Sequence, residues 1–102
     1  MLLYNVTVSV DQRKETEWLR WMKNEHIPEV MATGIFTMHR ICRLVQPEPQ
    51  PEEGVTYAIQ YYCDSQEQLN RYFRDFAPAL QQAHMVKYGQ HTVAFRTVLE
   101  IV

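Results

Sequence analysis

The sequence is poor in the residues that most catalytic sequence motifs require. Only three glycines and two cysteines occur among its 102 residues. So few glycines disfavour the loops of Walker, Rossmann and nucleophile-elbow motifs, and with them nucleotide-dependent chemistry and serine-based hydrolysis. Cys42 and Cys63 lack CxxC spacing, so we expect two buried, reduced cysteines rather than a disulfide or a redox pair.

An excess of one charge and a long apolar run are also absent. Ten Lys and Arg against twelve Asp and Glu give a formal net charge of −2, and the basic residues form no dense stripe. No window approaches the roughly 20 apolar residues that span a bilayer, and the first ten residues lack the basic start of a signal peptide. We therefore expect a cytoplasmic protein with neither a nucleic-acid nor a membrane partner.

The four histidines are not spaced as metal ligands. No HxH or HxxxH pattern occurs in the sequence, and a single HxxE spacing is present, His26 with Glu29. His39 and His91 lie on or beside expected strands, without a carboxylate at ligand spacing. We therefore expect neither a metal ion nor another cofactor.

The first third of the chain has the pattern of a strand followed by a helix. Apolar and more polar side chains alternate along residues 2–10, as in a strand with one apolar face. The carboxylate of Asp11 can accept from backbone N–H groups at a helix start. Because Pro28 has no N–H to donate, we expect this helix to end or bend near His26.

Three further strands are expected. Gly34 allows the chain to reverse into the first of them, over residues 35–45. Residues 46–54, "QPEPQPEEG", contain three prolines and therefore form a turn between antiparallel strands. The strongest β-forming residues lie in 55–63, and the last strand covers 91–102.

A second helix lies between the last two strands. Ser65 and Gln68 have the spacing of a capping box at its start. Pro78 should bend or divide this helix, because it removes an N–H donor inside the pattern. Gly89 is expected to end it.

The resulting order is β-α-β-β-α-β. It predicts an α+β, ferredoxin-like fold, in which a four-stranded antiparallel sheet carries both helices on one face. We expect residues 1–102 to form one such domain.

The other face of the sheet also needs an explanation. In each strand we predict that the more polar set of alternating residues lies on this open face: Leu3, Asn5, Thr7 and Ser9; Thr56, Ala58, Gln60 and Tyr62; and Ala94, Arg96, Val98, Glu100 and Val102. This mixed surface suits a subunit contact, which predicts a homodimer through the open face. A solvated face with scattered apolar atoms, as in monomers, is the alternative.

Several segments resemble a known family. "LYNVTV", "EWLRWMKNEHIPEVMATGIF", "VTYAIQYY", "FAPALQQAH" and "VAFRTVLEIV" resemble an uncharacterised bacterial domain-of-unknown-function family. That family belongs to the dimeric α/β-barrel superfamily, with the antibiotic-biosynthesis-type monooxygenases. The resemblance covers nearly the whole chain. It implies that two sheets pack face to face and that the enzymes of the group bind a ligand between sheet and helices.

His26 is the candidate catalytic residue. It resembles the histidine that many relatives carry at the end of the first helix, and a neutral imidazole could act there as a general base. A hydrogen bond to the helix end is the structural alternative. Candidate ligand-binding residues are Trp18, Trp21, Met22, Tyr57, Tyr61 and His84, which could equally be core residues.

Two arginines on expected strands have open roles. Arg40 and Arg96 could point to solvent or form ion pairs, for example with Glu100 or across a dimer. An inward arginine could instead hold an anionic substrate through two parallel hydrogen bonds.

Two functions follow from these observations. The first is a small-molecule site for a flat or aromatic compound, with cofactor-free oxygenation or isomerisation as its most elaborate form. It requires a cavity of roughly 300 Å³ or more. The second is a non-enzymatic homodimeric scaffold or regulatory binding protein, because no titratable pair with an orienting third group occurs in the sequence.

Overall fold

The computed structural model describes residues 1–48, 50, 52 and 54–102. In chain order its elements are β1 (Leu2–Val10), η1 (Gln12–Lys14), α1 (Glu15–Trp21), η2 (Met22–His26), α2 (Ile27–Ala32), β2 (Phe36–Arg43), β3 (Val55–Cys63), α3 (Gln66–Asp75), α4 (Ala77–Tyr88) and β4 (Thr92–Glu100). The predicted turn over 46–54 lies partly outside the described residues.

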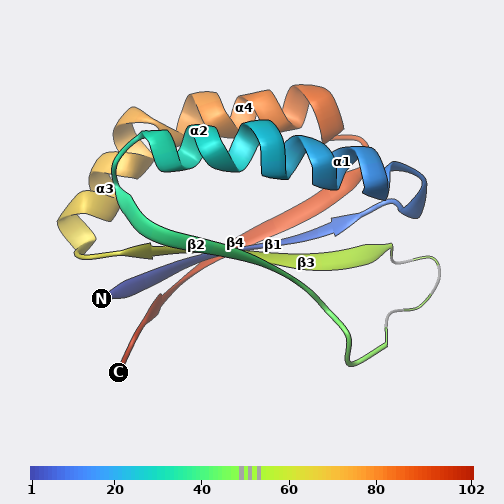
Figure 1. The fold of residues 1–102 in the computed structure, drawn as a ribbon, viewed down its shortest axis with the longest axis horizontal. Helices are drawn as coiled ribbons and strands as arrows, with labels where there is room; N and C mark the ends of the chain where they lie inside the picture. The colour runs from blue at the N-terminus through green and yellow to red at the C-terminus, as the bar shows by residue number, and fades with distance from the viewer. Residues whose placement is uncertain (49, 51, 53) are drawn as a thin grey trace.

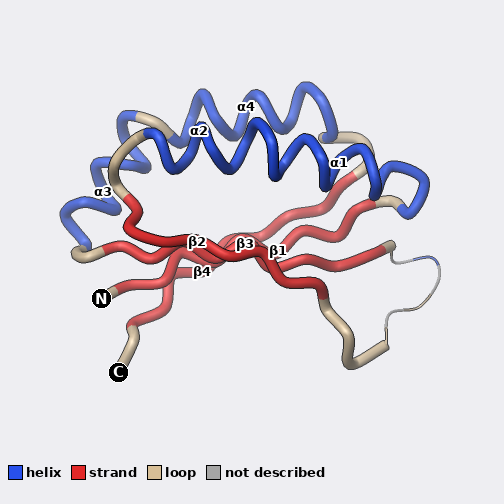
Figure 2. The backbone as a smooth tube through the Cα atoms, in the orientation of Figure 1, coloured by secondary structure: helices blue, strands red, loops and turns tan. Residues whose placement is uncertain are grey.

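The strands form one antiparallel sheet in the order β2-β3-β1-β4. All helices lie on the same side of this sheet, as Figures 1 and 2 show. The fold is therefore ferredoxin-like α+β, as the sequence predicts. None of these helices lies on the other face of the sheet.

The sequence predicts that the first helix ends or bends near His26, and its regular α-helical pattern is interrupted there. The chain does not leave the helix at that point, because α1 continues through the π-helical turn η2 into α2. Pro28 stands in the first turn of α2, where the missing N–H costs little because the wider π turn has already shifted the hydrogen-bond pattern. Gly34, at φ 78°, then reverses the chain as expected.

The second helical segment follows the sequence closely. The hydroxyl of Ser65 accepts from the backbone N–H of Gln68 at 3.2 Å and starts α3. The helix divides at Phe76, two residues before Pro78, and α4 ends at Gly89. Local capping and proline signals therefore decide these boundaries.

The core lies between the sheet and the helices. Its largest fully buried side chains are Trp18, Ile59, Leu69, Val8, Val10, Val30 and Cys63. Burial of each large apolar side chain contributes about 1.5–3 kcal/mol. Cys42 differs from the prediction, because it is exposed on β2, opposite Ala58 on the open face.

The open face agrees with the prediction on β1 and β3 but not on β4. Residues paired across antiparallel strands share a face, and Thr7 pairs with Phe95 while Val6 pairs with Arg96. Val93 and Phe95 therefore lie on the open face, and Arg96 faces the helices. The more apolar set of β4 is the one left uncovered, with Val93 73% and Phe95 60% exposed.

Polar side chains are linked across the open face. Arg40 Nε donates to Gln60 Oε1 at 2.8 Å, and Gln60 Nε2 donates to Asn5 Oδ1 at 3.4 Å. The Asn5 amide in turn donates to the hydroxyl of Thr7 at 3.0 Å. Arg40 is thus held on this face by hydrogen bonds within the sheet.

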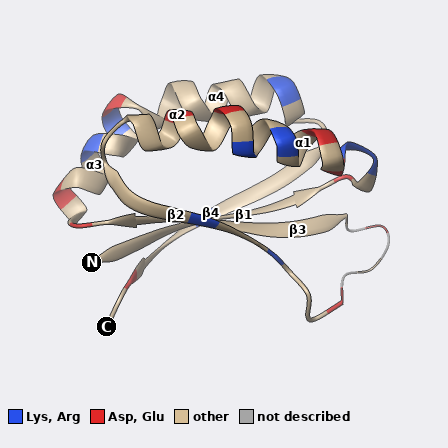
Figure 3. Cartoon of the chain, in the orientation of Figure 1, with Lys and Arg blue, Asp and Glu red and all other residues tan. Residues whose placement is uncertain are grey.

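Charged side chains of both signs are scattered over the helices, whereas the strands carry few of them (Figure 3). None of the helices in the described part of the chain is long and apolar enough to cross a membrane.

Candidate functional site

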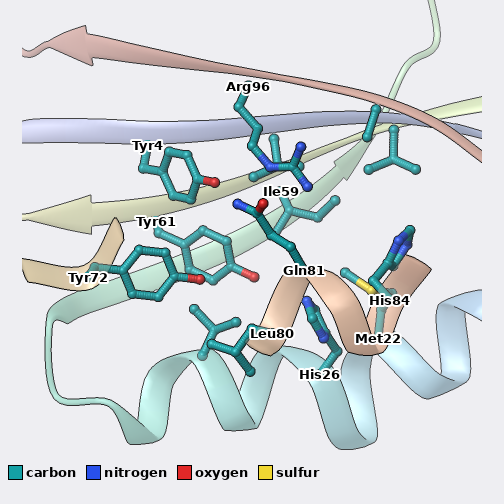
Figure 4. A pocket seen from close by; sticks show the side chains of 14 residues that line it. Tyr4, Met22, His26, Ile59, Tyr61, Tyr72, Leu80, Gln81, His84 and Arg96 are labelled. Atoms are coloured by element: carbon teal, nitrogen blue, oxygen red, sulfur yellow. The ribbon is translucent and has the colours of Figure 1, made fainter. Parts of the chain in front are cut away.

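A small internal pocket lies between the helices and the covered face of the sheet (Figure 4). Its apolar floor is formed by Val6 and Val8 of β1 and Ile59 of β3. The cavity has a volume of about 40 Å³, enough for a few water molecules or one carboxylate-sized group. It is far smaller than the expected site of roughly 300 Å³, because buried aromatic side chains fill most of the space.

His84 of α4 is held at this pocket by a buried tryptophan. The indole N–H of Trp18 donates to Nε2 of His84 at 3.0 Å, and Trp18 is completely buried. Because the indole can only donate, Nε2 of His84 must be the acceptor and Nδ1 carries the proton of the neutral ring. Burial lowers the pKa of His84, and the charge of Arg96 lowers it further.

His26 faces the same pocket from the π-helical turn. Its ring stacks on Trp21 with centroids 4.9 Å apart, and its centroid lies 5.9 Å from that of His84. Burial lowers the pKa of His26 to about 4, with smaller contributions from His84 and Arg96. The ring is therefore neutral at pH 7, and its Nδ1 is buried without a hydrogen-bond partner in the described part of the chain.

Three tyrosine hydroxyls point into the pocket from the other end, as Figure 4 shows. Tyr4 comes from β1, Tyr61 from β3 and Tyr72 from α3. Burial raises the pKa of all three phenols. They stay protonated at neutral pH and can donate hydrogen bonds to a ligand.

Arg96 and Gln81 complete the polar lining. Arg96 is exposed, so the pocket opens to solvent beside its guanidinium. Gln81 of α4 lies between Arg96 and the tyrosines in Figure 4. No group of three or more His, Cys, Asp or Glu side chains that could hold a metal ion occurs among the described residues.

The structure brings four of the predicted site residues together. His26, Met22, Tyr61 and His84 line the pocket. Trp18 and Trp21 do not line it but lie behind the two histidines, one as a hydrogen-bond donor to His84 and the other as a stacking partner of His26.

Tyr57 lies away from the pocket. Its hydroxyl donates to the carboxylate of Glu15 at 2.5 Å, and Glu15 is 3.8 Å from Arg43. Burial and this carboxylate raise the pKa of Tyr57 to about 12. Tyr57 thus joins α1 to the sheet rather than contributing to the site.

Sequence reasoning missed Tyr4 and Gln81, and it assigned Arg96 to the open face, with an inward arginine only as an alternative. The signal for Arg96 lies in the register of β4 against β1, which puts it beside Val6. Tyr4 was part of the apolar alternation of β1 and looked like any core residue.

The fold and pocket define a ferredoxin-like protein with an internal polar site. The chain matches over residues 1–102 the family described as Domain of unknown function (DUF4286), and it belongs to that family. No curated protein matches the sequence.

Solved structures share the fold at low sequence identity. A MhuD mutant with two manganese protoporphyrin IX molecules bound per active site has a TM-score of 0.71 at 14% identity, covering 100% of this chain and 95% of that one. A dimeric ferredoxin-like protein from an uncultured marine organism has a TM-score of 0.68 at 9% identity, covering 99% and 94%. A Deinococcus radiodurans protein assigned as an antibiotic biosynthesis monooxygenase has a TM-score of 0.66 at 11% identity, covering 100% and 93%. These neighbours confirm the ferredoxin-like fold that the sequence predicts.

Proposed function

We propose that the protein is a homodimer whose subunits each bind a small flat or aromatic molecule between sheet and helices. The observation that carries this proposal is the pocket itself. Two neutral imidazoles, three phenol hydroxyls, an amide and a guanidinium converge on one small internal space. Such convergence of polar groups on an internal pocket is typical of ligand sites, since polar groups are otherwise seldom turned toward a core.

The size of the pocket limits how such a molecule would bind. With about 40 Å³ available, only a polar end group of the molecule enters. Its flat body would lie at the open side, beside Arg96. The expectation of a cavity of roughly 300 Å³ that encloses the whole molecule is therefore wrong for this pocket, and only the end group of the ligand is proposed to lie between sheet and helices.

The proposed dimer uses the open face of the sheet. Phe95 and Leu99 on that face are 60% and 49% exposed, and Met38 on β2 is 52% exposed. Large apolar side chains gathered on one face are characteristic of protein interfaces. The marine protein with the same fold, described as dimeric, supports this assembly.

His26 is the proposed catalytic group if the ligand is a substrate. A neutral imidazole can accept a proton from the ligand, and tyrosine hydroxyls can stabilise negative charge on a carbonyl oxygen. Proton abstraction of this kind could begin cofactor-free isomerisation or oxygenation. A protein assigned as an antibiotic biosynthesis monooxygenase shares the fold, which is compatible with such chemistry.

A non-enzymatic regulatory binding protein is the second candidate. The small cavity favours it, because there is little room to enclose a reacting group away from water. A homodimeric scaffold without any ligand would leave the convergent polar groups unexplained.

Ligand screening by thermal unfolding tests the proposal. We expect flat organic acids and ketones to raise the midpoint of the wild-type protein. The shift should disappear in His26→Gln but persist in the matched variant His39→Gln, because His39 is an exposed residue of β2 that does not line the pocket. A library that leaves the wild-type midpoint unchanged would contradict ligand binding.

A further inference from the structure

We infer that the pocket binds an anionic oxygen group, and specifically the carboxylate of a small organic acid, with Arg96 at its mouth and the tyrosine hydroxyls inside. This inference rests on the proposed function, because it names the chemical class of ligand for the same pocket.

The charge of the pocket lining favours an anion. Among the residues that line the pocket, Arg96 is the only one with a full charge at pH 7, because none is Asp or Glu and both histidines are neutral. Arg96 has no ion-pair partner among the described residues. A guanidinium with no carboxylate beside it favours an anion, and it matches a carboxylate through two parallel hydrogen bonds.

Two of the tyrosine hydroxyls at the pocket are hydrogen-bond donors without an acceptor in the described part of the chain. The hydroxyls of Tyr61 and Tyr72 form no hydrogen bond within the described residues. Neither hydroxyl oxygen is a fully buried atom without a partner, so both remain accessible from the pocket. Each therefore has an O–H to donate, and the best acceptor for several such donors is an oxygen with negative charge.

His84 is a donor at this site as well. Its Nε2 accepts from Trp18 at 3.0 Å, so the free ring nitrogen is Nδ1 with its proton. Because the indole N–H of Trp18 occupies Nε2, His84 offers no acceptor to a ligand. The pocket consequently presents more donors than acceptors, and the ligand must supply the acceptors.

The volume of the pocket limits the part of the ligand that can enter. About 40 Å³ accommodates two oxygens and a carbon but not a ring. The rest of the acid must leave through the open side, where Arg96 is exposed. A carboxylate at the end of a flat molecule fits both the charge and the volume.

Binding of benzoate and acetate tests this inference against their neutral counterparts, benzamide and acetamide. Titration is followed by NMR at pH 7 and constant ionic strength, using the side-chain signals of Arg96 and His84. We expect the carboxylates to bind at least about tenfold more tightly than the amides, the difference expected of one charge-assisted hydrogen bond.

Two matched variants assign the binding to Arg96. Arg96→Gln should weaken benzoate binding at least about tenfold, and its exposed position makes loss of the fold unexpected. Arg20→Gln, the same change on the exposed surface of α1 and outside the pocket, should bind like the wild type. Sedimentation of both variants checks that neither change alters the oligomeric state.

The possible results distinguish the carboxylate preference from the existence of a ligand site. Equal binding of benzoate and benzamide would overturn the carboxylate inference and leave the proposed ligand site standing. Benzoate binding that survives Arg96→Gln would overturn the inference that Arg96 holds the carboxylate. No binding of any of the four probes up to about 50 mM, where fragment-sized ligands are detected, would overturn both proposals.

Discussion

The indole Nε1 of Trp18 lies 3.0 Å from Nε2 of His84, and it donates a hydrogen bond to that nitrogen. The two residues are 66 positions apart in the sequence and connect α1 with α4. The contact fixes the tautomer of one of the two histidines at the pocket. It also opposes protonation of His84, since a protonated ring would turn an N–H toward the indole N–H.

We predict that Trp18→Phe changes the tautomer and raises the pKa of His84. Without the indole donor, Nε2 of His84 becomes free to carry a proton. The protonated ring then no longer places its Nε2–H against the indole N–H, so the pKa of His84 rises. Nitrogen-15 shifts of the imidazole ring, followed against pH, measure both effects. The wild type should show the proton on Nδ1, and the opposite tautomer would contradict this account.

Trp21→Phe is the matched control for this experiment. Trp21 contacts His84 through its ring, with centroids 5.9 Å apart, and donates no hydrogen bond to it. The tautomer of His84 should therefore stay on Nδ1 in this variant.

We predict that stability falls as the pH is lowered from 6.5 to 4. Burial lowers the pKa of His26 from 6.5 to about 4 in the folded state. Between these values the unfolded chain binds more protons than the folded one, so protonation favours unfolding. His84, whose pKa is also lowered, acts in the same direction. The stabilisation is complete above pH 6.5 and is lost as the pH approaches 4.

Urea unfolding at a series of pH values measures this effect. His26 should contribute on the order of 2 kcal/mol, after allowance for partial screening by solvent. The His26→Gln variant should lose most of this dependence, whereas His91→Gln should keep it. A wild-type stability that stays constant between pH 6.5 and 4.5 would show that His26 titrates normally.

We predict opposite consequences for two tyrosines of β3. Tyr57→Phe removes a hydrogen bond to the half-buried carboxylate of Glu15 and should cost about 1–2 kcal/mol of unfolding free energy. Tyr61→Phe removes a hydroxyl that has no partner in the described residues, so stability should change little while benzoate binding weakens. Urea unfolding and the NMR titration together check the pair. Equal effects of both changes on binding would mean that Tyr61 does not face the ligand.

Local signals in the sequence were sufficient for most of the fold. The alternation along β1, the cap at Asp11 and the cap at Ser65 each depend on neighbouring residues only, and the structure confirms them. Pro28 correctly indicated an interruption of the helix near His26, but its form, a π turn after which proline is tolerated, is not announced by any local pattern.

The site depends on relationships between distant parts of the chain. In β4 both alternating sets contain apolar residues, so periodicity cannot decide which set faces the helices. Only the pairing of Arg96 with Val6 places its guanidinium at the pocket. The volume of the pocket is equally inaccessible to sequence reasoning, because it is the small remainder of how the side chains around Trp18 and Tyr61 pack.

We predict that Phe95→Asp abolishes the dimer. Phe95 is 60% exposed on the open face of β4, and a carboxylate buried there between two subunits would lack a partner. Sedimentation at micromolar concentration should show a dimer for the wild type and a monomer for the variant. The monomer should remain folded, because Phe95 contributes little to the core of its own chain.

Met85→Asp is the matched control. Met85 is 62% exposed, nearly the same as Phe95, but it lies on α4, on the helical side of the sheet. The same change of charge at the same exposure should leave the dimer intact, because only the open face is buried in the proposed assembly. A dimer lost through Met85→Asp and kept in Phe95→Asp would place the contact on the helices. A wild-type monomer at this concentration would rule out the open-face dimer altogether.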